Sequence, residues 1–122
     1  MIPAENIRIT TIVENTTSVG GVLAEWGISV FIEAGENRFL LDTGTSGIVV
    51  PNADRLGIDL KKSEALVLSH GHYDHTGGLE AVLQRIHRPE VRIVAHPEVF
   101  GRKYSHNKKK NTYRYAGIPF CR

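Results

Sequence analysis

Four side chains that can bind a metal ion fall within six consecutive residues: His70, His72, Asp74 and His75. Imidazole nitrogen together with carboxylate oxygen suits zinc, iron or manganese better than calcium or magnesium, which prefer shells made only of oxygen. The alternative is a polar, histidine-rich loop that binds nothing. Because an H-x-H-x-D-H run would rarely arise by chance, the sequence indicates a site for one or two divalent transition-metal ions, with zinc as first choice.

This cluster lies between two segments with regular patterns. The apolar run 65–68 predicts a buried strand, and apolar residues at helical spacing over 79–86 predict a helix. A loop between the carboxyl end of a strand and a helix is a usual place for sites in α/β folds. In an extended loop alternate residues point the same way, so the first two histidines could grip one metal and the following Asp-His pair a second.

The motif also resembles a known family. The sequence His70-x-His72-x-Asp74-His75 behind a hydrophobic strand is similar to the signature of the metallo-β-lactamase superfamily. The longer strings 52–60 and 66–79 resemble its β-lactamase superfamily II group of metal-dependent hydrolases, which includes dihydropterin–aminobenzene ribofuranosyl phosphate synthases. The resemblance runs from roughly Ile7 to the C-terminus.

The predicted fold class is α/β. Periodicity alone gives strand, hairpin and strand–helix–strand patterns, and the last crossover should be parallel and right-handed. The resemblance implies the N-terminal half of an αββα fold, a mixed sheet with helices on one face, in a single truncated domain 1–122. The expected strands are 7–13, 26–34, 38–42, 64–69 and 91–95, and the expected helices are 48–56 and 78–86.

The resemblance implies a hydrolase in which metal-bound hydroxide attacks an ester or phosphoester of a small-molecule substrate. The four residues of the cluster would hold the metals, and Asp74 would also take part in catalysis. In the family, further histidine and aspartate ligands come from a second half of the fold, and no His or Asp follows His106 here. The alternative is therefore a non-catalytic, metal-binding or oligomerising half-fold.

Asp42 has three interpretations. In the resembling family an aspartate at the end of this hairpin supports the metal site by orienting a ligand, and we count Asp42 with the catalytic residues on that basis. Its setting, Leu40-Leu41-Asp42-Thr43-Gly44, also resembles an aspartic protease motif, in which two chains each contribute one aspartate. The third interpretation is an ordinary aspartate that caps a turn.

His96 follows the predicted strand 91–95 and should reach the same rim of the sheet as the metal-binding loop. It is the candidate for substrate binding or for an extra metal ligand. The alternative is a rim histidine bonded to nearby backbone.

Charge is distributed unevenly along the chain. Residues 1–100 carry 8 Lys and Arg against 13 Asp and Glu, a net charge of −5, whereas residues 101–122 carry 7 basic and no acidic residues. This basic arm shows no clear amphipathic period, and it could fold over the site or stay partly mobile. Its Lys108-Lys109-Lys110 run either attracts phosphate groups of a substrate or is a solvated surface; nucleic acid is not favoured, because no aromatic stacking order accompanies it.

Composition limits location and suggests a partner. No apolar run is long enough to span a membrane, and no secretory signal is evident. The single cysteine, Cys121, favours a reducing compartment, so the expected location is the cytoplasm. Half of a two-sheet sandwich would leave one apolar sheet face exposed, and a homodimer or higher oligomer would cover it.

Overall fold

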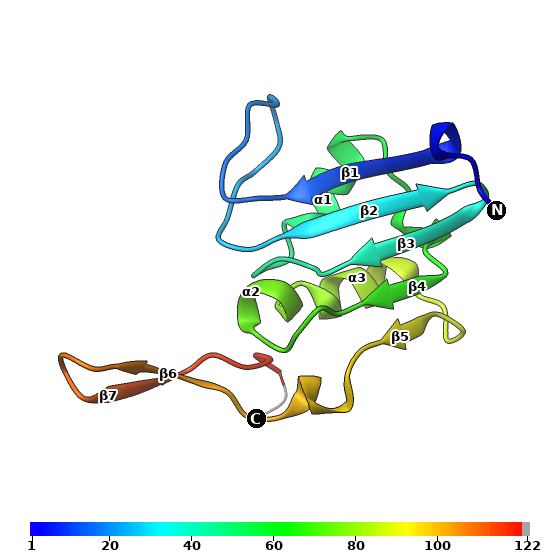
Figure 1. The fold of residues 1–122 in the computed structure, drawn as a ribbon. Coiled ribbons are helices and arrows are strands. Elements are labelled where there is room, and N and C mark those ends of the chain that lie inside the picture. The colour runs from blue at the N-terminus through cyan, green and yellow to red at the C-terminus, as the bar shows by residue number, and fades with distance from the viewer. Residues whose placement is uncertain (121–122) are drawn as a thin grey trace.

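The fold is built on one five-stranded mixed sheet (Figure 1). The computed structural model describes residues 1–120, so the expectation based on Cys121 lies outside the described part. The strand order is β1-β2-β3-β4-β5, with β1, β2 and β3 antiparallel and β4 and β5 parallel to β3. The predicted mixed α/β architecture is confirmed. The strands are β1 (Ile7–Val13), β2 (Ser29–Ala34), β3 (Asn37–Leu41), β4 (Ala65–Val67) and β5 (Arg92–Val94).

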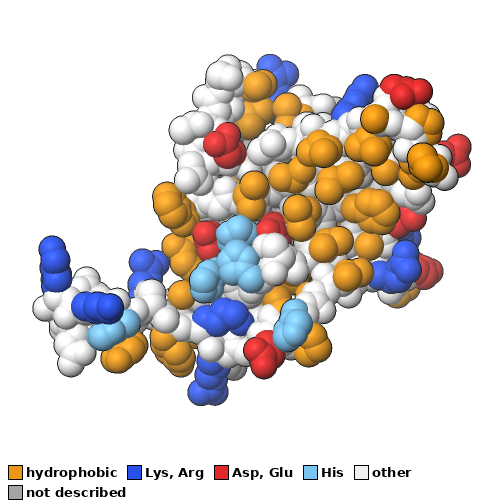
Figure 2. All heavy atoms as spheres, in the orientation of Figure 1, with side chains coloured by type: hydrophobic (Ala, Val, Ile, Leu, Met, Phe, Trp, Pro, Cys, Tyr) orange, Lys and Arg blue, Asp and Glu red, His pale blue; other side chains and the backbone are white. Residues whose placement is uncertain are grey.

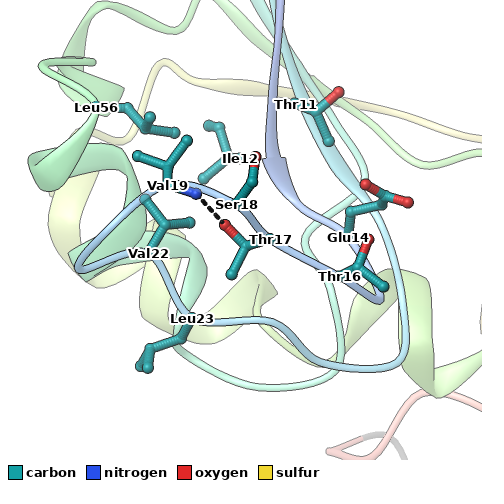
Figure 3. A pocket seen from close by; sticks show the side chains of 10 residues that line it. All are labelled: Thr11, Ile12, Glu14, Thr16, Thr17, Ser18, Val19, Val22, Leu23 and Leu56. Carbon is teal, nitrogen blue, oxygen red and sulfur yellow. Dashed lines mark hydrogen bonds between the residues drawn. The ribbon is translucent and has the colours of Figure 1, made fainter.

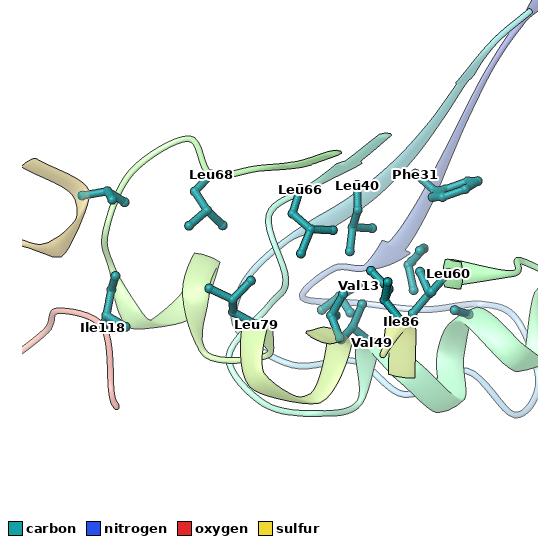
Figure 4. Close-up of a cluster of buried hydrophobic side chains, with 14 residues drawn as sticks. Val13, Phe31, Leu40, Val49, Leu60, Leu66, Leu68, Leu79, Ile86 and Ile118 are labelled. Atoms are coloured by element: carbon teal, nitrogen blue, oxygen red, sulfur yellow. The ribbon is translucent and has the colours of Figure 1, made fainter. Parts of the chain in front are cut away.

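The two longer helices both cover one face of this sheet, as predicted. They are α1 (Val49–Arg55), between β3 and β4, and α3 (Leu79–Ile86), between β4 and β5. Leu40 and Leu66 on the sheet and Val49 on α1 are fully buried between the two layers (Figure 4). Val82 on α3 is fully buried as well. Pro51 lies in the first turn of α1, where the missing amide hydrogen costs no intrahelical bond.

On the opposite face of the sheet, no helix or strand of residues 1–120 forms a covering layer, and the face is rich in apolar side chains (Figure 2). Ile9 pairs with Ile32, and Ile32 pairs with Phe39, so these three residues lie side by side across three strands. Ile9 is 66% exposed. The expected open apolar face is therefore present.

Three elements differ from the sequence-based expectation. The strand predicted from Trp26 begins only at Ser29, because Trp26 and Gly27 form a bend. The predicted metal loop contains a short helix, α2 (Tyr73–Thr76). The basic arm, which showed no period, forms a hairpin of β6 (Tyr104–Asn107) and β7 (Thr112–Tyr115), and its three lysines lie at the turn.

Three short 3₁₀ helices complete the described chain. Within residues 1–120 no helix has the length and hydropathy needed to cross a bilayer. The 3₁₀ helices are η1 (Ala4–Asn6), η2 (Leu60–Lys62) and η3 (Pro97–Phe100).

Candidate metal centre

The cluster is assembled where two neighbouring parallel strands end. Leu41 of β3 lies opposite Val67 of β4, so the residues that follow these strands emerge at the same rim. Asp42 follows β3 directly, and Ser69 follows β4 after one intervening residue. The rim thus brings together two segments that are far apart in the sequence.

Asp42 lies beneath the histidines with both carboxylate oxygens engaged. Its Oδ1 accepts a hydrogen bond from the Ser69 amide at 2.8 Å, and its Oδ2 accepts one from the Ser69 hydroxyl at 2.6 Å. Oδ2 also lies 2.7 Å from His75 Nδ1. The residue is 2% exposed and adopts a left-handed backbone conformation with φ of 55°. This buried arrangement fits an orienting aspartate and argues against an aspartic protease, whose carboxylate must reach substrate.

His75 is fixed from two sides. Because a carboxylate can only accept a hydrogen bond, His75 Nδ1 is the donor to Asp42, and in the neutral ring the lone pair is then on Nε2, which lies 3.6 Å from Asp74 Oδ2. The carbonyl oxygen of His75 accepts hydrogen bonds from the Thr43 amide at 2.8 Å and from the Thr43 hydroxyl at 3.0 Å. The free nitrogen of His75 and the Asp74 carboxylate therefore form one donor pair on α2.

His70 and His72 form a second pair. Their Nε2 and Nδ1 atoms are 3.1 Å apart. Two nitrogen ligands of one tetrahedral zinc ion, each at the usual bond length, lie about 3.3 Å apart. The rings of His70 and His75 have centroids 4.0 Å apart, so the two pairs are adjacent. Figure 2 shows these histidines gathered at the surface beside the open sheet face.

The environment of His70 favours its neutral form. Burial lowers the pKa of His70 below its usual value, and the neighbouring His75 and His72 lower it further, against a smaller opposing effect of the two aspartates. A neutral imidazole has a free lone pair, which is the form that binds a metal.

The cluster consists of imidazole and carboxylate groups, which are the kinds of donor that transition metals bind, but it does not form a complete site. Within residues 1–120 no group of three or more His, Cys, Asp and Glu side chains converges on one point. Zinc normally takes four ligands, and each of the two pairs supplies two. The His70 ring lies 4.7 Å from the His72 ring and 4.0 Å from the His75 ring, centroid to centroid, so the division into a His70–His72 pair and an Asp74–His75 pair stays a prediction.

His96 lies near the cluster, as its position after β5 suggested. It lines a pocket of about 660 Å³ together with His70, Gly71 and Lys103. The Nδ1 atom of His96 accepts a hydrogen bond from the Glu98 amide at 3.2 Å and so caps η3. Nδ1 of His96 is therefore bonded to nearby backbone, as in the alternative interpretation of a rim histidine. The ring still borders the cavity beside His70.

Sequence reasoning missed several residues at this rim. Ser69 contacts Asp42 through its amide and its hydroxyl, and its hydroxyl also lies 2.9 Å from His70 Nδ1. Its position directly before the motif was the available signal. Trp26 and Arg114 line another pocket with His72 and Asp74, and no local pattern announced either, because only the tertiary fold brings them there.

A third pocket lies away from the cluster. It has a volume of about 460 Å³ and is lined by the end of β1, the loop that follows it and Leu56 (Figure 3). Threonine, serine and aliphatic side chains form its walls, Thr17 accepts a hydrogen bond from the Val19 amide at 3.2 Å, and Glu14 is the one titratable residue among those that line it. None of the motif residues reaches this pocket.

Comparison with known sequences places these residues in context. Residues 27–119 match the family described as the metallo-beta-lactamase superfamily. The 7,8-dihydropterin-6-methyl-4-(beta-D-ribofuranosyl)-aminobenzene-5'-phosphate synthase of Methanocaldococcus jannaschii is 35% identical in an alignment of 102 residues that covers 79% of this chain and 34% of that protein. An uncharacterized protein of the same organism is 34% identical over 110 residues, 90% of this chain and 40% of that protein. The chain thus spans little more than a third of these relatives.

Solved structures give the same result for the fold. The Rm3 metallo-beta-lactamase superposes with a TM-score of 0.52 at 25% identity, over 63% of this chain and 29% of that one. The MIM-2 metallo-beta-lactamase gives a TM-score of 0.51 at 29% identity, over 60% of this chain and 28% of that one. The chain therefore has part of the fold of these enzymes, as the sequence motif predicted.

Proposed function

Because the chain belongs to the metallo-β-lactamase superfamily, we propose that it carries the metal-binding rim of a hydrolase that cleaves an ester or phosphoester bond in a small molecule. The observation that supports this most directly is the pairing of ring nitrogens at 3.1 Å in His70 and His72, beside the Asp74–His75 pair. Members of this superfamily typically bind divalent metals.

Each residue of the rim has a defined task in this proposal. His70 Nε2 and His72 Nδ1 would hold one metal ion, and Asp74 and His75 Nε2 a second. A bound divalent metal would act as a Lewis acid and lower the pKa of water at the site toward neutrality. Asp42 keeps the proton of His75 on Nδ1, so that Nε2 stays available.

The name of one relative and the charge of the basic arm support a proposal for the substrate class. One relative is named for a product that carries a 5'-phosphate. The arm after residue 100 has 7 basic and no acidic residues. Both support a phosphorylated small molecule as substrate. The imidazole and carboxylate donors of the cluster support zinc, iron or manganese as the metal.

Elemental analysis of the purified chain tests the metal assignment. The wild-type chain should contain zinc, iron or manganese, and a His70→Ala/His72→Ala double variant should lose the metal held by that pair. A His87→Ala/His106→Ala variant removes two exposed histidines outside the motif and is the matched control. Equal metal content in all three proteins would overturn the assignment. Zinc- or manganese-dependent cleavage of a generic phosphodiester or lactone, absent in the His70/His72 variant, would support hydrolysis.

A second candidate function is a non-catalytic, oligomerising half-fold that binds metal. The apolar open face of the sheet favours it, because Ile9, Ile32 and Phe39 would be covered in a dimer of two such sheets. Sedimentation should then show a dimer or larger oligomer, and Ile9→Lys should shift it toward monomer. A monomeric wild-type chain would exclude self-association, whereas metal-dependent turnover would exclude the non-catalytic alternative.

A further inference from the structure

The basic hairpin is attached to the metal-binding loop and does not extend freely. The amide of Tyr73, the first residue of α2, donates a hydrogen bond to the Ala116 carbonyl at 3.1 Å, and the Ala116 amide donates to the Lys103 carbonyl at 2.8 Å. These bonds tie the base of the hairpin to the segment that carries Asp74 and His75. Figure 1 shows β6 and β7 projecting from that end of the sheet.

A pocket of about 380 Å³ lies between this hairpin and the metal loop. His72 and Asp74 belong to its lining, so the pocket includes one residue of each donor pair. Its other main walls are three aromatic side chains and one cation, contributed by four separate segments of the chain. They are Trp26, Tyr73, Tyr104 and Arg114.

The backbone at Trp26 and Gly27 holds the tryptophan side of the pocket in place. Gly27 adopts φ of 138°, and a Cβ atom there would lie 2.2 Å from the Asp74 carbonyl oxygen, so only glycine lets this segment approach α2 so closely. The Gly27 amide donates to Asn15 Oδ1 at 3.1 Å, and the Thr45 hydroxyl donates to the Trp26 carbonyl. Trp26 thus stands beside the metal loop although its side chain is 66% exposed.

Arg114, the cation in the pocket lining, lies over the ring of Tyr73. The Arg114 guanidinium lies 5.7 Å from the centroid of the Tyr73 ring, a cation–π distance. Within residues 1–120 the ion pairs of the structure include none that involves Arg114. Tyr104, 56% exposed, packs edge-on against Tyr115 at 5.5 Å. Large exposed aromatic surfaces and an arginine without an acidic partner are therefore combined in one pocket.

We propose that this pocket binds the recognition group of the substrate, an aromatic or heteroaromatic ring joined to an anionic group, with the ring against Trp26 and Tyr104 and the anion at Arg114. Aromatic side chains provide flat apolar contact area, and arginine binds phosphate or carboxylate with two parallel hydrogen bonds. This inference rests on the proposed function, since the pocket borders the same His72 and Asp74. It makes Arg114 and Trp26 determinants of substrate specificity.

Fluorescence of the chain tests the pocket directly, because Trp26 is its single tryptophan. Phenyl phosphate is titrated into the 122-residue chain after treatment with a chelator, so that the result does not depend on metal binding. A saturable change in Trp26 emission is expected. The dissociation constant should be about tenfold higher or more for inorganic phosphate, which lacks the ring, and for benzyl alcohol, which lacks the anion.

Arg114→Gln should weaken phenyl phosphate binding by about tenfold, since a charge-assisted hydrogen-bond pair is lost. Lys109→Gln removes the same charge from the hairpin turn, outside the pocket, and should leave binding within about twofold. Arg114→Lys keeps the positive charge but loses the paired hydrogen bonds, so its affinity for phenyl phosphate should lie between those of wild type and Arg114→Gln. Equal effects of Arg114→Gln and Lys109→Gln on phenyl phosphate binding would overturn the proposed role of the pocket. The absence of any saturable change in emission would overturn it too. A protein that holds metal but fails this test would retain the proposed function and lose only the specificity pocket.

Discussion

Asp42 and His75 are joined by a hydrogen bond of 2.7 Å between Oδ2 and Nδ1, across 33 residues of sequence. The bond links the end of β3 to the helix α2 inside the metal-binding loop. It determines which nitrogen of His75 carries the proton, and so which nitrogen is left to bind a metal. Residues that hold a ligand in this way commonly affect affinity nearly as much as the ligand itself.

Asp42→Asn should therefore weaken metal binding by about 10- to 100-fold. Asparagine has only one side-chain oxygen that can accept the hydrogen bond from His75 Nδ1. Its NH₂ group would then face the Ser69 amide, which is also a donor. Competition with a chromophoric chelator measures the affinity, at a temperature where circular dichroism shows the variant folded. Glu36→Gln, at the exposed β2–β3 turn, is the control with the same loss of charge. Unchanged affinity in Asp42→Asn would contradict the orienting role.

Gly77 permits a close approach between the metal loop and the segment after β3. A Cβ atom at Gly77 would lie 1.8 Å from the Thr45 carbonyl oxygen, whereas nothing lies within 4 Å of one added at Gly20. Gly77→Ala should lower the free energy of unfolding by about 2 kcal/mol or more, since backbone must move, and Gly20→Ala should change it little. Urea denaturation of both variants checks this, and equal stabilities would show that the loop yields without cost.

Leu66 lies at the centre of the layer between sheet and helices. It is 0% exposed, whereas Leu23 is 55% exposed. Leu66→Ala should lower the free energy of unfolding by about 2–5 kcal/mol through lost burial and a residual cavity, and Leu23→Ala by less than about 1 kcal/mol. Chemical denaturation followed by circular dichroism gives both values. Similar losses in the two variants would mean that the core is not centred on β4.

Asp54 on α1 and Arg85 on α3 form a two-bond ion pair, with distances of 2.6 and 3.0 Å. The hydrogen bond from Arg85 lowers the pKa of Asp54 below its usual 3.8. A lowered pKa means that the pair stabilises the fold above the unfolded-state pKa and that this contribution is lost as the pH falls through the folded-state pKa. Asp54→Asn should thus lower the melting temperature slightly at neutral pH, with the difference from wild type vanishing in acid below 3.8.

Because the pair is exposed, high salt should also reduce that difference. Thermal melts of wild type and Asp54→Asn at several pH values and two salt concentrations provide the measurement. A difference that persists unchanged in acid would mean that Asp54 acts through packing or helix propensity and not through its charge.

The sequence by itself determined the cluster of histidines and aspartate and the layered core. His70, His72, Asp74 and His75 are close in the chain, so backbone geometry alone keeps them within reach of one another. The period of the apolar residues in 79–86 fixed which face of α3 is buried, because that period follows from the helix repeat. The parallel pairing of β4 with β5 followed from the same strand–helix–strand pattern.

Only the tertiary structure decided which distant residues complete the rim. Ser69 and Asp42 meet because β3 and β4 are parallel neighbours, and the hairpin after residue 103 reaches α2 through a backbone bond from Tyr73 to Ala116 that no side-chain pattern encodes. Trp26 stands at the pocket because Gly27 tolerates a backbone contact with Asp74. Contacts of this kind depend on the packing of segments far apart in sequence, and local periodicity carries no information about them.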